Sequence, residues 1–392
     1  MFEYLQTQDN KQKVAIICVG YNRIKSMKRL LGSLLNAEYP SNDIPLIISI
    51  DCSGDEALYN YVSEFEWPYG DKYVNIQKDR LGLRNHIYQC GDLSEYFKAI
   101  ILLEDDLFVS PYFYHYAQQA IDKYGEVEDI AEISLYRNDS NGYAGFPFSP
   151  MQNGADVFLW HDVSTWGEIW TPSMWKSFVY WRDHICSEDI IQRVDMPDRI
   201  KSWTRAWSKY YNAYVISTGK HVLYPYVSLT TNFSDAGEHG GDSKGEVQVD
   251  MMYGKKNYAM PNIKELVRYD IYDNNEAIPE WVGYKPEELC LDLYGINNNI
   301  YGRRYILSSR HLPYKVLKSY ALWMRPIELN IKYNIEGSGL FLYDTSVRNN
   351  GKKPAAYSKS FMHFMMHGIA PHEIWKYSRI SIINSIKRKL HL

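Results

Sequence analysis

The sequence lacks several features that would point to particular classes of protein. It has five cysteines in 392 residues and no CxxC pair, so neither a disulfide framework nor a zinc site is expected, and a reducing compartment fits best. It has no run of eighteen apolar residues that could span a membrane. Residues 1–13 are polar and contain no secretory signal, which favours a cytoplasmic protein.

An excess of positive charge is also absent. The formal net charge is -4 at pH 7, so no nucleic acid is expected as a partner. The chain is instead rich in aromatic residues, with 35 Tyr, 11 Trp and 13 Phe. Aromatic rings can stack on sugar rings, and they can equally fill a tyrosine-rich core, so this composition favours a carbohydrate ligand only weakly.

The first third of the chain alternates between strand-like and helix-like patterns. Apolar runs predict strands at 14–20, 45–51, 73–77, 98–103 and 130–136, and helical spacing predicts helices at 24–36, 55–65, 85–97 and 111–124. Such alternation predicts an α/β fold, with a mostly parallel sheet and helices on both faces. Ligands of such sheets bind at the carboxyl ends of the strands.

The pattern weakens further along the chain. Aromatic residues at helical spacing predict one helix over 198–218, followed by a strand over 222–231. Beyond residue 262 the alternation is lost, so we expect a catalytic domain over 1–262 and a C-terminal extension over 263–392. The extension ends in a basic tail with apolar residues on one helical face, as in helices that lie on anionic membranes and equally in frayed termini.

Three consecutive acids, Glu104, Asp105 and Asp106, directly follow the predicted strand at 98–103. Packed carboxylates repel one another, and a divalent cation removes that cost. Mn²⁺ and Mg²⁺ prefer oxygen ligands, and Mg²⁺ is commonly held by one or two carboxylates together with substrate phosphates. The motif therefore predicts a Mn²⁺ or Mg²⁺ site in an enzyme that uses a nucleotide. The alternative is a solvated acidic turn.

Other polar side chains fall near the predicted strand ends. Asp51 ends the strand at 45–51, where it can accept a hydrogen bond from a base or ribose, or cap the helix that follows. Arg23 follows the predicted strand at 14–20, and Arg80, Arg84 and His86 follow the predicted strand at 73–77. A guanidinium suits phosphate oxygens, so these residues contribute to a site if the fold brings them to the acids.

Taken together, these segments resemble the GT-A family of nucleotide-sugar glycosyltransferases. The sequence is most similar to the animal N-acetylglucosaminyltransferase that starts complex N-glycans and to bacterial sugar transferases of surface-polysaccharide clusters. The resemblance runs through 17–23, 48–52, 83–86, 102–113, 132–142, 164–175 and 222–240. It implies a GT-A mixed sheet and inverting transfer of a hexosyl or N-acetylhexosaminyl group from a nucleotide sugar to an acceptor hydroxyl.

The resemblance also implies roles for individual residues. Asp106 would bind the metal that bridges to the diphosphate, and His239, otherwise a loop histidine, would contact the metal or a phosphate. Glu104 and Asp105 would face the ribose and the donor sugar. Asp51 would read the uracil edge, which implies a UDP-sugar. The remaining nucleotide-binding residues would be Tyr21, Asn22, Arg23, Arg84 and His86.

One feature departs from the family pattern. The family has its catalytic Asp directly after a tryptophan on the helix before the strand at 222–231, but Thr204 and Ser208 follow the two tryptophans here. The general base is therefore sought among other acids. Asp198 at the start of that helix and Glu168 in the tryptophan-rich segment are the candidates, with a helix cap as the alternative role of Asp198.

The sequence thus predicts a metal-dependent glycosyltransferase that extends a bacterial surface glycan, free or lipid-linked, in the cytoplasm, with peripheral contact to the plasma membrane through its tail. Two alternatives stay open. A sugar-phosphate nucleotidyltransferase would need a glycine-rich phosphate loop, whereas Gly20–Arg23 holds one glycine. A non-catalytic nucleotide- or sugar-binding relic is favoured by the missing base.

Overall fold

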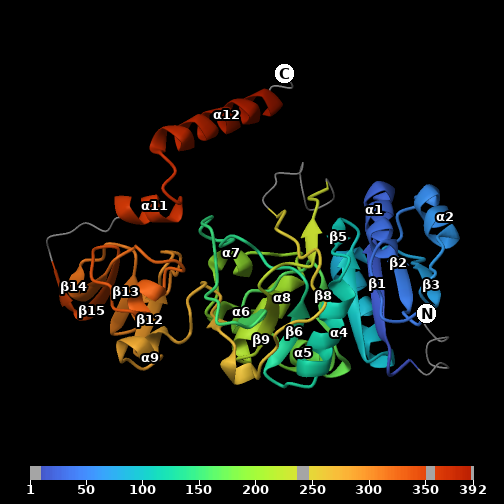
Figure 1. Ribbon diagram of the computed structural model, residues 1–392, viewed down its shortest axis with the longest axis horizontal. Coiled ribbons are helices and arrows are strands. Elements are labelled where there is room, and N and C mark those ends of the chain that lie inside the picture. Colours follow the sequence, from blue (N-terminus) through green and yellow to red (C-terminus); the bar gives the residue numbers. More distant parts are fainter. Residues whose placement is uncertain (1–9, 236–246, 350–357, 390–392) are drawn as a thin grey trace. The chain divides into compact units, whose positions relative to one another are not determined.

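The computed structural model describes residues 10–235, 247–349 and 358–389, and the chain divides into two compact units (Figure 1). The first unit comprises Met1–Asp139 and Pro150–Asn275, and the second comprises Ser140–Ser149 and Glu276–Leu392. All five cysteines are free thiols. In the part of the chain that the structure describes, no helix has the length and apolar character needed to cross a membrane.

The first unit is built on a mixed sheet, which has nine strands among the described residues (Figure 1). These are β1 (Val14–Gly20), β2 (Leu46–Ile50), β3 (Lys72–Ile76), β4 (Ala99–Glu104), β6 (Ile130–Ser134), β7 (Val157–Trp160), β8 (Glu168–Trp170), β9 (His221–Pro225) and β11 (Arg268–Tyr269). Their order is β11-β7-β9-β6-β8-β4-β1-β2-β3. β1 to β4 are mutually parallel, and β8 runs antiparallel between β4 and β6.

Helices cover both faces of this sheet. The described helices of this unit are α1 (Ile24–Leu35), α2 (Glu56–Glu64), α3 (Gly82–Asp92), η2 (Leu93–Tyr96), α4 (Phe113–Tyr124), α5 (Pro172–His184), α6 (Glu188–Arg193), α7 (Asp198–Lys201), α8 (Ser208–Ser217) and η3 (Ile263–Glu265). Right-handed crossovers place α1 and α2 on one face and α3 on the other, because the chain reverses its direction across the sheet after β3. Trp175 of α5 donates a hydrogen bond to Asp92 of α3 at 2.8 Å, so α5 shares the face of α3. The predicted α/β class, with a mixed sheet and helices on both faces, is confirmed.

The aromatic-rich region differs from its prediction. The helix expected over 198–218 is two helices, α7 and α8, which residues 202–207 separate. The aromatic spacing misleads because Trp207 is fully buried whereas Trp203 is only half-buried, so the two rings do not belong to one buried helical face. The strand expected over 222–231 is also split, since β9 ends at Pro225 and β10 (Thr230–Asn232) pairs instead with β5 (Leu107–Val109).

The second unit has a four-stranded sheet in the order β12-β13-β15-β14. Its described elements are α9 (Ile278–Val282), β12 (Leu289–Asp292), η4 (Ile300–Gly302), β13 (Tyr305–Ser308), β14 (Tyr314–Tyr320), α10 (Leu329–Lys332), β15 (Leu340–Arg348), α11 (Lys359–Met365) and α12 (Pro371–Lys389). The segment Ser140–Ser149 belongs here because Phe146 packs on Phe361, with ring centroids 5.6 Å apart. β11 lies beyond residue 262 but pairs with β7 in the first unit.

Candidate active site

A pocket of about 630 Å³ lies at the carboxyl ends of the parallel strands of the first unit. Its walls come from the loop after β1, the turn after β4, the start of α3, and segments 165–166, 203–208 and 232–235. Eight residues predicted from the sequence line it: Tyr21, Asn22, Arg23, Asp51, His86, Glu104, Asp105 and Asp106. The fold therefore brings together side chains that are spread over almost ninety positions of the sequence.

The acid motif forms the turn between β4 and β5. Glu104 is the last residue of β4, and β5 begins directly after Asp106. Because β5 pairs with β10, the segment that follows β10 is held beside this turn, and the Phe233 amide donates a hydrogen bond to the Asp106 carbonyl at 2.9 Å. This pairing also brings Asp235 to the pocket. Sequence reasoning missed Asp235, since no local signal shows that β10 pairs with β5.

Arg23 joins two of the acids. Its Nη1 lies 3.2 Å from Oδ2 of Asp106, its Nε lies 3.3 Å from Oδ2 of Asp105, and its Nη2 also donates to Asp105. Burial opposes the charge on Arg23, but the two carboxylates outweigh it and raise the pKa of Arg23 above its usual range. Burial raises the pKa of Asp105 to about 6, although Arg23 acts in the opposite direction.

The remaining acid of the motif, Glu104, is electrostatically crowded. Burial, followed by the charges of Asp106 and Glu168, raises the pKa of Glu104 well above its usual value. A protonated Glu104 can donate a hydrogen bond to a ligand oxygen, which a carboxylate cannot do. Burial therefore raises the pKa of both Glu104 and Asp105, and Arg23 opposes the shift at each of them.

Asp106 has the arrangement expected of a metal ligand. Its Oδ2 accepts a hydrogen bond from Arg23, but its Oδ1 is buried and has no hydrogen-bond partner among the described residues. Leaving a buried carboxylate oxygen unsatisfied is costly, and a divalent cation with a preference for oxygen ligands would satisfy it. The residues present therefore fit Mn²⁺ or Mg²⁺. The predicted second ligand, His239, lies outside the described residues.

Asp51 has more backbone contacts than the sequence suggests. Its Oδ1 accepts hydrogen bonds from the amides of Cys52 at 2.9 Å and Leu81 at 2.8 Å, and its Oδ2 accepts one from the amide of Gly82 at 2.9 Å. The carboxylate therefore fixes the turn that begins α3, where Gly82 has a φ of +73°. Asp51 also lines the pocket, and contact with a uracil edge remains a prediction.

His86 and Arg84 lie on the same helix but have different surroundings. The Nε2 of His86 lies 2.7 Å from the hydroxyl of Ser49, and burial lowers the pKa of His86 to about 4, so its ring is neutral at pH 7. Arg84 is not among the residues that line the pocket. It donates a hydrogen bond to the carbonyl of Thr204 at 2.7 Å and its guanidinium lies 4.7 Å from the ring centroid of Tyr210, so it holds the 202–207 segment to α3.

Neither residue predicted as the general base lines the pocket. Asp198 is the first residue of α7 and its side chain is exposed. Glu168 is fully buried in β8, where it lies opposite Leu102 of β4 and Ser134 of β6. Burial, together with the neighbouring Glu132, raises the pKa of Glu168 well above its usual value.

The pocket wall also carries residues to which the sequence assigned no role. It includes the indoles of Trp166, Trp203 and Trp207 and the side chain of Arg205. The tryptophan-rich composition was the available signal, but spacing alone could not separate the tryptophans that line the pocket from those in the core. Elsewhere on the wall lies Arg80, which the sequence grouped with Arg23, Arg84 and His86; its guanidinium is 4.8 Å from the ring centroid of Tyr21.

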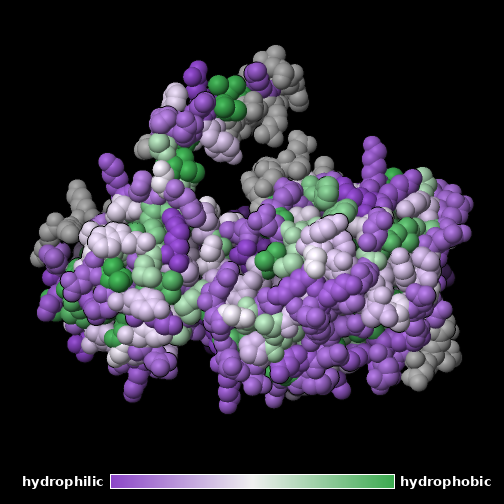
Figure 2. Space-filling model, viewed as in Figure 1, coloured by the Kyte–Doolittle hydropathy of each residue, from purple (hydrophilic) through white to green (hydrophobic). Residues whose placement is uncertain are grey.

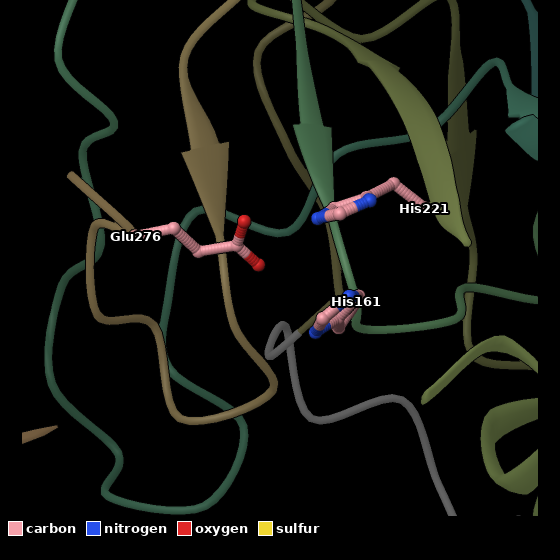
Figure 3. A group of neighbouring side chains, drawn as sticks. All are labelled: His161, His221 and Glu276. Carbon is pink, nitrogen blue, oxygen red and sulfur yellow. The ribbon is translucent and has the colours of Figure 1, made fainter. Parts of the chain in front are cut away.

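Two histidines of the first unit form a separate pair (Figure 3). His161 follows β7 and His221 begins β9, and their rings stack with centroids 4.1 Å apart and an interplanar angle of 27°. Neither lines the pocket described above. Glu276, which Figure 3 also labels, is the first residue after Asn275 and belongs to the second unit.

No family model and no curated protein sequence matches the chain. The fold is partly similar to solved structures. These include residues 1–349 of TarS from S. aureus in complex with UDP-GlcNAc (16% identity, TM-score 0.36, 61% of this chain and 62% of that one). They also include the mannosyltransferase PcManGT from Pyrobaculum calidifontis with GDP-Man and Mn²⁺ (8%, 0.34, 57% and 59%). A third is GalNAc-T7 with UDP, GalNAc and Mn²⁺ (12%, 0.36, 56% and 43%).

The chain spans about 60% of the length of the truncated TarS structures and 36% of the longer one. Overlap of this extent and quality assigns no activity. The function therefore has to be argued from the pocket.

Proposed function

We propose that this protein is a metal-dependent glycosyltransferase of the GT-A type. It would transfer a hexosyl or N-acetylhexosaminyl group from a nucleotide sugar, a UDP-sugar in the first instance, to an acceptor hydroxyl. The observation that carries the proposal is the unsatisfied Oδ1 of Asp106, which lies in a pocket with Arg23 and two further acids at the carboxyl ends of parallel strands. Such strand ends are where α/β sheets bind nucleotides.

The walls of the pocket suit the two halves of such a donor. Arg80 and Arg205 offer guanidinium groups that match the oxygens of a diphosphate. Trp166, Trp203 and Trp207 offer indole rings of the kind that pack against sugars and bases. The pocket volume of about 630 Å³ is within the range of small-ligand and cofactor sites.

The protein's own residues would then act as follows. Asp106, with its second oxygen held by Arg23, would bind the cation through the free oxygen. Glu104, which also lines the pocket, would form a hydrogen bond with a hydroxyl of the ribose or the donor sugar. A bound Mn²⁺ or Mg²⁺ would neutralise charge on the departing diphosphate. Inverting transfer is part of the proposal, and no base is assigned, because Asp198 and Glu168 do not line the pocket.

The acceptor in this proposal is a bacterial surface glycan, free or lipid-linked, as the sequence resemblance implies. We place the reaction in the cytoplasm, in keeping with five free thiols in a chain of this size. Both statements rest on the proposed transferase activity and not on a contact seen in the pocket.

The proposal is tested by incubating the full chain with a panel of nucleotide sugars and Mn²⁺ and measuring release of the nucleoside diphosphate. We expect Asp106→Asn to reduce turnover by at least about 10²-fold, because one negative charge is lost at the cation. EDTA should have the same effect. Asp43→Asn, which alters an exposed acid paired with Lys13, is the matched control and should keep full activity.

Each alternative predicts a different result. Consumption of a sugar phosphate and a nucleoside triphosphate with release of pyrophosphate would show a nucleotidyltransferase. Binding of UDP without turnover of any donor would show a binding relic. Full activity in EDTA, or in the Asp106→Asn variant, would contradict the metal site.

A further inference from the structure

The C-terminal helix α12 exposes large apolar side chains along its length (Figure 2). The exposed fractions of five of these residues lie between 40% and 64%: Trp375, Ile380, Ile382, Ile383 and Ile386. Most isolated apolar residues on a protein surface need no explanation, but a contiguous group on one element marks an interaction site. The question is which side of α12 carries them and what else lies on that side.

Two adjacent rows of α12 hold these residues. The first row has the spacing i, i+4, i+7 and i+11, which keeps its members on one face of a helix. It consists of Trp375, Arg379, Ile382 and Ile386. The second row repeats this spacing one residue later along the helix and lies beside the first. It consists of Lys376, Ile380, Ile383 and Lys387. Both rows mix branched apolar residues with basic ones.

The opposite side of the helix has a different character. Tyr377 and Ser378 fall there. Glu373, the one acid in residues 371–389 against five basic residues, precedes Lys376 by three positions and so lies at the N-terminal end of the second row. A helix that docks on a protein core places its charges away from its apolar stripe. Here the positive charges lie within and beside the stripe. The guanidinium of Arg379 lies 5.6 Å from the ring centroid of Trp375, so charge and aromatic surface share one patch.

An anionic lipid surface satisfies both components of this face at once. Isoleucine and tryptophan side chains enter the boundary between head groups and acyl chains, and tryptophan is enriched at that depth. Lysine and arginine stems are long enough to lie along the apolar layer while their charged ends reach the phosphates. The negative potential of an anionic leaflet attracts basic residues within a Debye length of the surface.

We propose that the face of α12 formed by the rows from Trp375 to Ile386 and from Lys376 to Lys387 is a docking surface for an anionic membrane. This inference does not depend on the enzymatic activity, since it concerns binding of the second unit to lipid. It adds a location to the proposed transferase: an enzyme held in this way would meet lipid-linked acceptors at the membrane surface.

The test is co-sedimentation of the full chain with vesicles of phosphatidylcholine alone and of phosphatidylcholine with equimolar phosphatidylglycerol. We expect binding to the mixed vesicles, little binding to the neutral ones, and weaker binding as salt is raised. Trp375→Ala with Ile382→Ala, and separately Lys376→Glu with Lys387→Glu, should each lower the partition coefficient by at least about tenfold.

Two matched controls separate this face from a general effect of sequence change. Tyr377→Ala removes an aromatic ring that is even more exposed than Trp375 and lies off the proposed face of α12. Lys315→Glu with Lys318→Glu reverses two charges on the exposed strand β14 of the same unit. Both controls should bind vesicles like the unaltered chain. Circular dichroism and thermal unfolding verify that each variant keeps its fold.

Several outcomes would overturn the proposal. Equal binding to neutral and anionic vesicles would remove the role of the basic residues, and equal loss in the Tyr377→Ala control would remove the role of the face. Self-association without lipid that Trp375→Ala abolishes would show that a second copy covers it. Absence of transferase activity with intact vesicle binding would contradict only the proposed function.

Discussion

Asp51 shows at the scale of a single residue how backbone contacts and ligand contacts compete for one carboxylate. Its oxygens hold the amides of Cys52, Leu81 and Gly82. We expect Asp51→Ala to lower the free energy of unfolding by about 1–3 kcal/mol, because three amide groups lose their acceptor. UDP should bind the unaltered chain more tightly than GDP or CDP, and the variant should lose part of that preference. Denaturant unfolding and calorimetric titration measure the two effects.

Asp55→Ala is the matched control for this prediction. Asp55 caps α2 by accepting one hydrogen bond from the amide of Leu58 at 3.1 Å. Its loss should cost about 1 kcal/mol of stability and leave nucleotide binding unchanged. If Asp51→Ala weakened UDP, GDP and CDP by the same factor, Asp51 would act only through the turn and the uracil contact would be wrong.

His86 gives a pH dependence of known sign. Its pKa in the folded protein is about 4, below the usual 6.5, because burial disfavours the charged ring. The unfolded chain therefore takes up a proton first as the pH falls, so the stability is fully present above about pH 6.5 and is lost as the pH falls toward 4. At pH 5 the loss due to His86 is about 2 kcal/mol.

The comparison that isolates this effect is the unaltered chain against His86→Gln, unfolded in denaturant at pH 7 and pH 5. Asp105 acts in the opposite direction, because its raised pKa lets the folded state bind a proton first below pH 6. Subtracting the two chains cancels that contribution. We expect His86→Gln to lose less stability on acidification, and parallel pH profiles would refute a neutral, buried His86.

Much of the pocket follows from sequence at this scale, and the exceptions have a common cause. An uninterrupted apolar strand ends in the acids Glu104, Asp105 and Asp106, so their position at the carboxyl ends of the parallel strands is predictable. Asp235 reaches the same place through pairing of β10 with β5. A contact that depends on antiparallel pairing of two three-residue strands leaves no periodic signal in either.

At the scale of whole elements, long apolar runs and regular helical spacing predict boundaries well. The sequence predicts β1 over 14–20 and the structure has Val14–Gly20, whereas β7 and β8 were not predicted. These strands have four and three residues and lie in a tryptophan-rich stretch, where strand and helix patterns cannot be told apart at such lengths. Tertiary pairing with β9, β4 and β6 decides them.

Two helical glycines test how tightly the elements pack. A Cβ on Gly91 of α3 would lie 2.2–2.5 Å from ring atoms of Trp175 on α5, whereas a Cβ on Gly32 of α1 would meet nothing within 4 Å. Gly91→Ala should therefore destabilise the protein by about 1–3 kcal/mol through overpacking. Gly32→Ala should stabilise it by up to about 1 kcal/mol through helix propensity. Denaturant unfolding giving the same sign for both would contradict the close approach of α3 and α5.

At the scale of the whole molecule, the sequence locates the change from one unit to the next only approximately. The loss of strand–helix alternation indicates an extension after residue 262, but the strand β11 at 268–269 still completes the first sheet. The segment Ser140–Ser149 is harder still, because it lies within the first unit's sequence and belongs to the second unit. Its Phe146 and Phe148 are buried aromatic residues, and the cores of both units contain such residues, so residue type does not show to which unit the segment belongs.

Phe146 provides the test of this division. It is buried and packs on Phe361, while the described residues that line the pocket all belong to the first unit. Phe146→Ala should cost about 3–5 kcal/mol in the second unit and leave UDP affinity unchanged. Phe178→Ala, which removes a buried ring of α5 that packs on Tyr211, is the counterpart in the first unit.

Scanning calorimetry with and without UDP and Mn²⁺ identifies the first unit, because a ligand raises the unfolding temperature of the unit that binds it. We expect Phe146→Ala to lower only the transition that does not respond to ligand, and Phe178→Ala to lower the one that does. A fall of the ligand-responsive transition in Phe146→Ala would place residues 140–149 in the first unit after all.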